Sequence, residues 1–221
     1  MPTRRSSRLF LAAGQKLSRW VGWNREADLL YVRGLDGFLT RRKAELIYDA
    51  VRGLQGPGAV AEVGSWKGKS TVALSLALQR AGRKGPIYAI DHHEGSEEHR
   101  EIVASEGSTW PTFLATIEAA GIADLVHPLR MGSLESARWL SEHGIKLRFL
   151  FLDGAHDEQS VRADLEAFIP LMLPGAYIAL DDAETGGPHP GVHRAYRTVL
   201  EPLCEEVAWG GAVLLVRLRG S

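Results

Sequence analysis

The sequence lacks most of the features that would place it in a specialised class. The chain of 221 residues has one cysteine, Cys204, so it cannot form an internal disulfide, and it shows no zinc-type spacing of Cys and His. No apolar run approaches the ~20 residues that a membrane-spanning helix needs. The net charge of −1 gives no footprint of nucleic-acid binding. These absences favour a cytoplasmic protein with no membrane span and no nucleic-acid partner, folded around one main core.

Acidic residues are also missing from the beginning of the chain, before Glu26. The apolar block at residues 9–13 is shorter than the ~7–15 residues of a signal-peptide core, and charged residues soon resume. We therefore expect an N-terminal helical segment over residues 1–53, made of a basic arm and a helix, followed by the main domain over residues 54–221. The basic side chains of the arm are Arg4, Arg5, Arg8, Lys16, Arg19 and Arg25.

After this segment, short apolar runs alternate with segments of helical periodicity. The runs predict strands at residues 59–63, 87–90, 124–129, 147–152 and 176–180. The periodic segments predict helices at residues 38–53, 71–81, 111–120, 134–142, 157–173 and 192–203. A hairpin over 207–209 and 212–218 closes the chain. Because parallel neighbours need crossover connections, we expect an α/β, Rossmann-like, doubly wound, mostly parallel seven-stranded sheet with an antiparallel C-terminal edge hairpin.

The stretch AVAEVGSWKGKS, residues 59–70, is typical of a cofactor-binding turn. A buried strand breaks at Gly64, and a second glycine, Gly68, precedes a helix. Glycine allows backbone to approach a ligand closely, and in such sheets ligands bind at the carboxyl ends of the strands. The turn therefore predicts a nucleotide-type cofactor.

Three cofactors compete for this turn. A phosphate-binding P-loop needs a glycine five residues before Gly68, and that position is Val63. A dinucleotide fingerprint needs G-x-G-x-x-G, which is absent between Gly64 and Gly68. The third cofactor, S-adenosylmethionine, contains no phosphate, and an acid at the end of the second strand, Asp91, suits its ribose hydroxyls.

Several segments together support the third cofactor. EVGSWKGKST, YAIDHHEG and FLDGAHDEQSVRADLEAFIPLMLPGAYIALDD resemble the class I S-adenosylmethionine-dependent methyltransferases. The similar group is the methyltransferase-24 family, which is related to macrolide-sugar O-methyltransferases and to cephalosporin-hydroxylase-like proteins. The resemblance covers residues 59–182, with Trp66 standing where the broader pattern has its middle glycine.

The resemblance implies which residues contact the cofactor. Those near its methionine end are Glu62, Gly64, Ser65, Gly68 and Ser70, those at the ribose are Asp91 and His92, and those near the adenine are Gly132 and Ser133. Asp153 is a further cofactor-binding residue.

Three aspartates at two strand ends point to the reactive centre. Asp153, Asp181 and Asp182 would repel each other in one cleft unless a cation neutralised them, and hard oxygen ligands favour Mg²⁺ or a similar ion. In the resembled sugar O-methyltransferases, a divalent ion at matching positions orients the substrate hydroxyls. Strand-end aspartates also commonly cap the next helix, so a structural role for Asp153 stays open.

His156 is the candidate general base, with Asp153 as its catalytic partner. An unperturbed imidazole pKa near ~6.5 suits removal of a proton at neutral pH. A structural role in anchoring the turn is the alternative for this histidine.

These patterns together predict a metal-dependent O-methyltransferase that acts on a small hydroxylated molecule such as a sugar or glycosylated metabolite. The resemblance also implies a homo-oligomer. A P-loop-like nucleotide-binding kinase and a non-catalytic cofactor-binding protein of the same fold are the alternatives.

Overall fold

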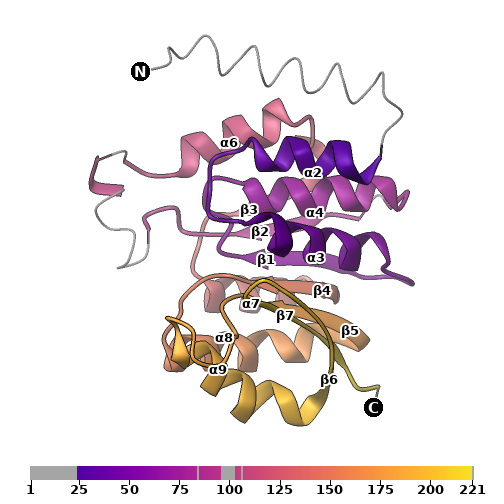
Figure 1. The fold of residues 1–221 in the computed structure, drawn as a ribbon, viewed down its shortest axis with the longest axis vertical. Coiled ribbons are helices and arrows are strands. Elements are labelled where there is room, and N and C mark those ends of the chain that lie inside the picture. The colour runs from indigo at the N-terminus through magenta and orange to yellow at the C-terminus, as the bar shows by residue number, and fades with distance from the viewer. Residues whose placement is uncertain (1–23, 84, 96–102, 106, 221) are drawn as a thin grey trace.

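A computed structural model describes residues 24–83, 85–95, 103–105 and 107–220 (Figure 1). The predicted basic arm lies outside these residues, apart from Arg25. The core is a seven-stranded sheet with the order β3-β2-β1-β4-β5-β7-β6. Its strands are β1 (Ala59–Val63), β2 (Ile87–Ile90), β3 (Val126–Leu129), β4 (Leu147–Leu152), β5 (Met172–Leu180), β6 (Cys204–Gly210) and β7 (Val213–Leu218).

Helices cover both faces of the sheet (Figure 1). One face carries α2 (Arg25–Arg33), α3 (Arg41–Arg52), α4 (Lys69–Arg80) and α6 (Trp110–Ala119). The other face carries α7 (Ser133–Glu142), α8 (Glu158–Phe168) and α9 (Pro190–Ala195). The structure also has short 3₁₀ turns at Ala123–Leu125, Ile169–Leu171 and Glu201–Leu203 and a π-turn at Tyr196–Leu200, and residues 103–105 are helical.

The central strand β4 is buried on both faces from Phe149 to Leu152. Phe149 and Phe151 join the core on the α3–α4 face, while Leu150 and Leu152 join the core on the α8 face. Because side chains alternate across a strand, a segment buried on both faces favours apolar residues at successive positions, and the charged residue of β4, Arg148, lies before this segment and is only partly buried.

The predicted fold class is confirmed. Strands β1 to β5 pair in parallel, and β7 pairs antiparallel to both β5 and β6. The C-terminal hairpin therefore forms an antiparallel edge, as predicted. Among the described residues, no helix combines the length and apolarity needed to cross a membrane.

The predicted boundary between the helix at 157–173 and the strand at 176–180 is wrong. The helix ends at Phe168, and β5 already begins at Met172. Pro170 interrupts the helix because proline cannot supply the helical N–H donor. The Pro174-Gly175 pair, which separates the predicted helix from the predicted strand, lies within β5 where the register against β4 shifts and Gly175 has a φ of 68°.

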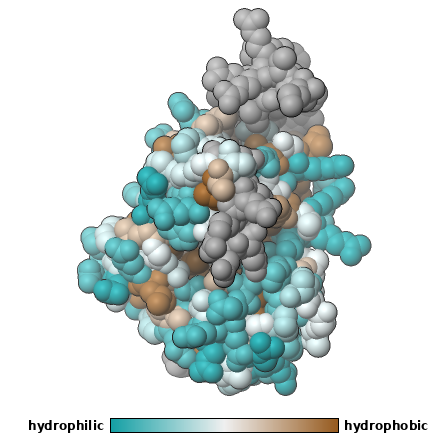
Figure 2. Space-filling view, turned by 90° about the vertical axis from the view of Figure 1, so that its left-hand side faces the viewer, coloured by the Kyte–Doolittle hydropathy of each residue, from teal (hydrophilic) through white to brown (hydrophobic). Residues whose placement is uncertain are grey.

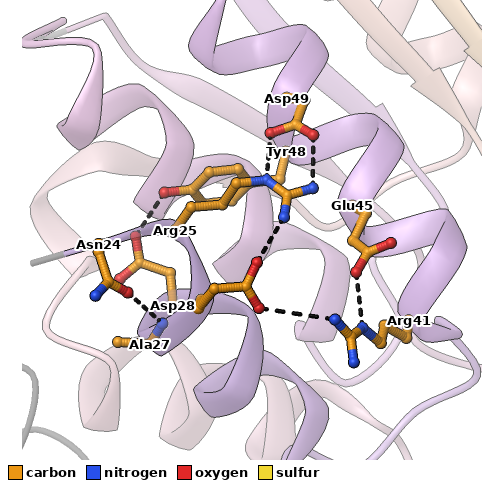
Figure 3. Close-up of polar contacts among 9 residues, drawn as sticks. Asn24, Arg25, Ala27, Asp28, Arg41, Glu45, Tyr48 and Asp49 are labelled. Carbon is orange, nitrogen blue, oxygen red and sulfur yellow. Dashed lines mark hydrogen bonds and ion pairs between the residues drawn. The ribbon is translucent and has the colours of Figure 1, made fainter.

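A buried ionic network joins α2, α3 and α4. Asp28, only 2% exposed, accepts two hydrogen bonds from Arg80 of α4, both 2.7 Å long, and one from Tyr48 of α3, 2.6 Å long. On the surface, Arg25 binds Asp49 through two hydrogen bonds, as the close-up of α2 and α3 shows (Figure 3). These contacts fasten α3 to the main fold. The predicted division of the chain at residue 53 stays a prediction.

Figure 2 shows the molecule from the side that lies on the left in Figure 1. Hydrophilic side chains prevail on this face, and apolar ones gather in small separate groups.

The turn after β1 depends on a glycine. Gly64 has a φ of 90°, and a Cβ at this position would lie 1.9 Å from the carbonyl oxygen of Asp153. The Asp153 N–H also donates to the Val63 carbonyl, so the ends of β1 and β4 touch through their backbones. A side chain at residue 64 would force these two ends apart.

We expect Gly64→Ala to lower the free energy of unfolding by at least about 2 kcal/mol, because it combines an unfavourable φ with a backbone clash. Chemical denaturation monitored by circular dichroism measures this loss. Gly132→Ala is the matched control, because nothing lies within 4 Å of a Cβ at that position. Equal stability of the two variants would contradict the argument.

Candidate active site

A cleft of about 690 Å³ opens at the carboxyl ends of β1 to β5. Residues directly after these strands line it, as the sheet topology requires. The predicted site residues found on its walls are Gly64, Ser65, Ser70, Asp91, His92, Gly132, Ser133, Asp153, His156, Asp181 and Asp182. The structure therefore brings most of the predicted site together.

Asp91 holds the glycine turn in place. One of its oxygens accepts the Trp66 N–H and the other accepts the His93 N–H, each at 2.7 Å. Both donors belong to residues with positive φ, 47° for Trp66 and 61° for His93. The carboxylate thus stabilises two unusual backbone conformations. It also lines the cleft, and its remaining lone pairs can accept further hydrogen bonds.

Two predicted cofactor residues, Glu62 and Gly68, lie behind the cleft wall. Gly68 has a φ of 90° at the start of α4, and a Cβ at this position would contact Phe113 and Thr116 of α6. Glu62 is 0% exposed and accepts a 2.5 Å hydrogen bond from Thr71 of α4. Their direct contact with a cofactor stays a prediction. In the structure, both residues shape the join between β1 and α4.

Burial also controls the ionisation of Glu62. Removal from water raises its pKa to about 7, although hydrogen bonds from Ser70 and Thr71 act in the opposite direction. A second buried carboxyl, Asp164 of α8, accepts a hydrogen bond from Ser133, and burial raises its pKa to about 6. Asp164 lines the cleft next to Ser133.

The acids at the end of β5 are paired with a lysine from the other end of the chain. Lys43 of α3 places its Nζ 2.7 and 2.8 Å from the two carboxylate oxygens of Asp181 and 2.9 Å from Oδ1 of Asp182. Burial acts to lower the pKa of Lys43, but the charges and hydrogen bonds of the two aspartates outweigh this effect and raise it. The lysine is therefore an ammonium ion inside the acid cluster.

Two stacked histidines complete this side of the cleft. The rings of His156 and His189 lie 4.2 Å apart, and the Nε2 atom of each is 3.6 Å from Oδ2 of Asp182. Nε2 of His156 also lies 3.9 Å from Oδ1 of Asp153. Partial burial and the nearby Asp181 raise the pKa of Asp153, while His156 opposes this shift.

The comparison with known families agrees with this arrangement. A family model described as a methyltransferase domain matches residues 61–183, more than half of the chain. The chain belongs to the methyltransferase-24 family. The protein is a class I S-adenosylmethionine-dependent methyltransferase.

Solved structures of similar fold align with nearly the whole chain of this methyltransferase. An O-methyltransferase from Bacillus cereus in complex with SAH has a TM-score of 0.61 and 20% identity, over 94% of this chain and 97% of that one. The O-methyltransferase NovP has a TM-score of 0.63 and 18% identity, over 96% and 99%. CalS11, a TDP-rhamnose 3'-O-methyltransferase of calicheamicin biosynthesis, has a TM-score of 0.58 and 18% identity, over 98% and 96%. At these identities the likeness establishes a shared fold.

The donor set of the methyltransferase does not fit the predicted divalent ion. An octahedral Mg²⁺ would need the aspartate oxygens around it at ~2.1 Å, but the Lys43 ammonium occupies the position between Asp181 and Asp182. A divalent ion sharing these oxygens would be strongly repelled by the ammonium. Within the described part of the chain, no group of three or more His, Cys, Asp or Glu side chains has metal-binding geometry. The structure therefore does not support the metal site predicted at Asp153, Asp181 and Asp182.

The lining residues that sequence reasoning did not assign to the site include Lys43, Asp164 and His189. Lys43 lies in the segment predicted to be separate, and Asp164 lies in a helix interpreted only through its apolar residues. His189 lies in a loop with no pattern that points to a site, and the close packing of Gly191 against the His156 backbone brings it into the cleft. For Asp164, the sequence did contain a signal of a role beyond packing: this acid lies on the helix face that is otherwise made of apolar core residues.

We expect Glu62→Gln to reduce the pH dependence of stability. The folded-state pKa of about 7 exceeds the ordinary value of 4.5, so the proton favours folding at low pH. This contribution is lost as the pH rises from about 4.5 through 7, and it amounts to about 3 kcal/mol. The amide keeps an acceptor for Thr71, so the variant should lose less stability than the wild type over this range.

Urea denaturation at closely spaced pH values tests this expectation, with the exposed Glu142→Gln as the control. Parallel stability profiles for the wild type and Glu62→Gln would show that the buried acid does not control this dependence.

Proposed function

We propose that this protein transfers the methyl group of S-adenosylmethionine to a hydroxyl of a small molecule. One observation carries the proposal: the glycine turn with Asp91 and the His156–Asp182 group line the same cleft. This arrangement would bring the donor and acceptor ends of a methyl transfer side by side. The assignment to a methyltransferase family gives no support to the kinase alternative.

The residues around the turn fit the cofactor. Asp91 would accept the ribose hydroxyls, and Gly132 and Ser133 would lie near the adenine. Ser65, 1% exposed on the wall of the cleft, has a buried hydroxyl for which the described residues offer no hydrogen-bond partner. Such a buried group is costly unless a ligand satisfies it, and the amino and carboxylate groups of the methionine end suit it.

At the acceptor end, His156 would remove the proton from the attacked hydroxyl. Oδ2 of Asp182 lies 3.6 Å from its Nε2, so the charge of Asp182 would stabilise the imidazolium that forms. S-adenosylmethionine supplies a methyl group on a sulfonium, and the departing sulfur takes the electrons of the broken carbon–sulfur bond. The protein contributes the alignment of the two reactants.

A sugar or glycosylated metabolite is the acceptor class we propose. CalS11, of similar fold, is a TDP-rhamnose 3'-O-methyltransferase. The acceptor end of this cleft is rich in hydrogen-bonding groups, which suits a polyhydroxylated molecule. A cytoplasmic location and a homo-oligomeric state complete the proposal.

We expect Asp91→Ala to weaken the binding of S-adenosylmethionine by at least about tenfold, since it removes the ribose acceptor and releases the two N–H groups that hold the turn. Isothermal titration calorimetry measures the affinity. Asp124→Ala, an exposed aspartate outside the cleft, is the control. The assignment would be refuted if Asp91→Ala bound S-adenosylmethionine with unchanged affinity. It would also be refuted if the wild-type protein bound ATP in preference to S-adenosylmethionine.

We expect His156→Gln to lower kcat by about 10²–10⁴-fold, as loss of a general base does, with little change in the affinity for S-adenosylmethionine. The assay follows transfer of a labelled methyl group to a panel of nucleotide sugars, glycosides and catechols. His143→Gln is the control, because His143 stacks on Trp139 away from the cleft. Equal rates for wild type and His156→Gln would exclude His156 as the base.

A further inference from the structure

The acid cluster at the end of β5 already contains its cation. We propose that Lys43 takes the place of a divalent ion in this methyltransferase, so that methyl transfer proceeds without a metal. The proposal rests on the function proposed above and adds to it the source of the positive charge. It also makes the N-terminal helix α3 a part of the active site.

Lys43 donates hydrogen bonds to both aspartates, to Oδ2 of Asp181 and to Oδ1 of Asp182. An ammonium group has three N–H donors, and Nζ lies within 2.9 Å of three carboxylate oxygens, two on Asp181 and one on Asp182. The side chains of Lys43 and Asp181 are 13% and 5% exposed. Water therefore screens this pair little, and its attraction is stronger than that of a surface ion pair.

The backbone of the acid pair is arranged around the lysine. Asp182 adopts a left-handed conformation with a φ of 52°, and its N–H donates to Oδ1 of Asp181. This conformation turns the carboxylates of two consecutive residues toward one cation. Such a backbone persists when its surroundings compensate for the strain, and Lys43 supplies that compensation.

The helix that carries Lys43 is held rigidly. Gly210 at the end of β6 lets α3 approach so closely that a Cβ there would lie 2.5 Å from the Cβ of Leu46 and 2.8 Å from the carbonyl oxygen of Arg42. Tyr48 is fully buried and donates to Asp28, which is itself paired with Arg80. The ammonium is therefore placed by packing and not by a freely moving side chain.

Lys43 acts on the reaction through Asp182. Because Oδ1 of Asp182 is bound to the ammonium, Oδ2 is the oxygen that faces the imidazoles of His156 and His189. An acceptor hydroxyl entering beside His156 would meet an aspartate oxygen of fixed position. Lys43 is thus a positioning residue, which need not touch the acceptor.

Titration with Mn²⁺, followed by electron paramagnetic resonance, tests the proposal without any need for turnover. We expect the wild type to bind no stoichiometric Mn²⁺, because the ammonium excludes it. Lys43→Met keeps the length of the side chain but removes the charge, so the three aspartates should then take up the ion. Lys146→Met is the control, because that exposed lysine donates to the Pro170 carbonyl outside the cleft.

A second arm measures methyl transfer in excess EDTA. We expect the wild-type rate to be unchanged, Lys43→Met to lose at least about tenfold in kcat, and added Mg²⁺ to restore part of the loss. Lys43→Arg should retain more activity than Lys43→Met because it keeps the charge.

Stoichiometric Mn²⁺ binding by the wild type, or loss of its activity in EDTA, would overturn the proposal. A Lys43→Met variant that kept the wild-type kcat in EDTA would also overturn the proposal, because Lys43 would then have a purely structural role. If Lys43→Met fails to fold, the Mn²⁺ titration of the wild type and its methyl-transfer rate in EDTA still test the proposal. Absence of both S-adenosylmethionine binding and methyl transfer in the wild type would instead refute the proposed function, and the Mn²⁺ titration would still report on the position of the cation.

Discussion

The backbone contact between the ends of β1 and β4 determines where the functional groups of this methyltransferase lie. Asp153 donates its N–H to Val63, and its carbonyl oxygen occupies the space that a Cβ on Gly64 would need. This contact places the glycine turn directly beside the end of β4, where Asp153 and His156 begin the proposed acceptor end. A glycine is required at residue 64 for backbone packing, whatever ligand the turn holds.

Electrostatic balance is the second constraint on the cleft. Three aspartates converge at the ends of two adjacent strands, and like charges so close together must be neutralised or protonated. The fold meets this need from inside the chain: α3 brings Lys43 to Asp181 and Asp182, and partial burial raises the pKa of Asp153. A charge cluster that suggests a metal ion in the sequence is thus largely compensated by a side chain in the structure.

Sequence patterns predicted the strands and most of the cleft because both follow from local chemistry. Strands buried on two faces are largely apolar, and in a parallel sheet the residues after each strand converge at one edge, so Asp91, Asp153 and Asp181 could be placed together. Glu62 was harder to interpret: in the structure it ties β1 to Thr71, and its predicted contact with the cofactor stays a prediction. The Pro174-Gly175 pair suggested a turn, but a register shift accommodates it inside β5.

The sequence by itself determined the alternation of strands and helices, the glycine turn after β1 and the resemblance to a methyltransferase family, because each depends on residues close together in the chain. Only the tertiary structure decided that Lys43 meets Asp181 and Asp182, across a separation of more than a hundred residues, and that His189 stacks on His156. The reason is physical. Which charges pair in a cleft depends on how helices such as α3 and α9 pack against the sheet, and glycines at positions 210 and 191 that permit this close packing carry no local sign of their partners.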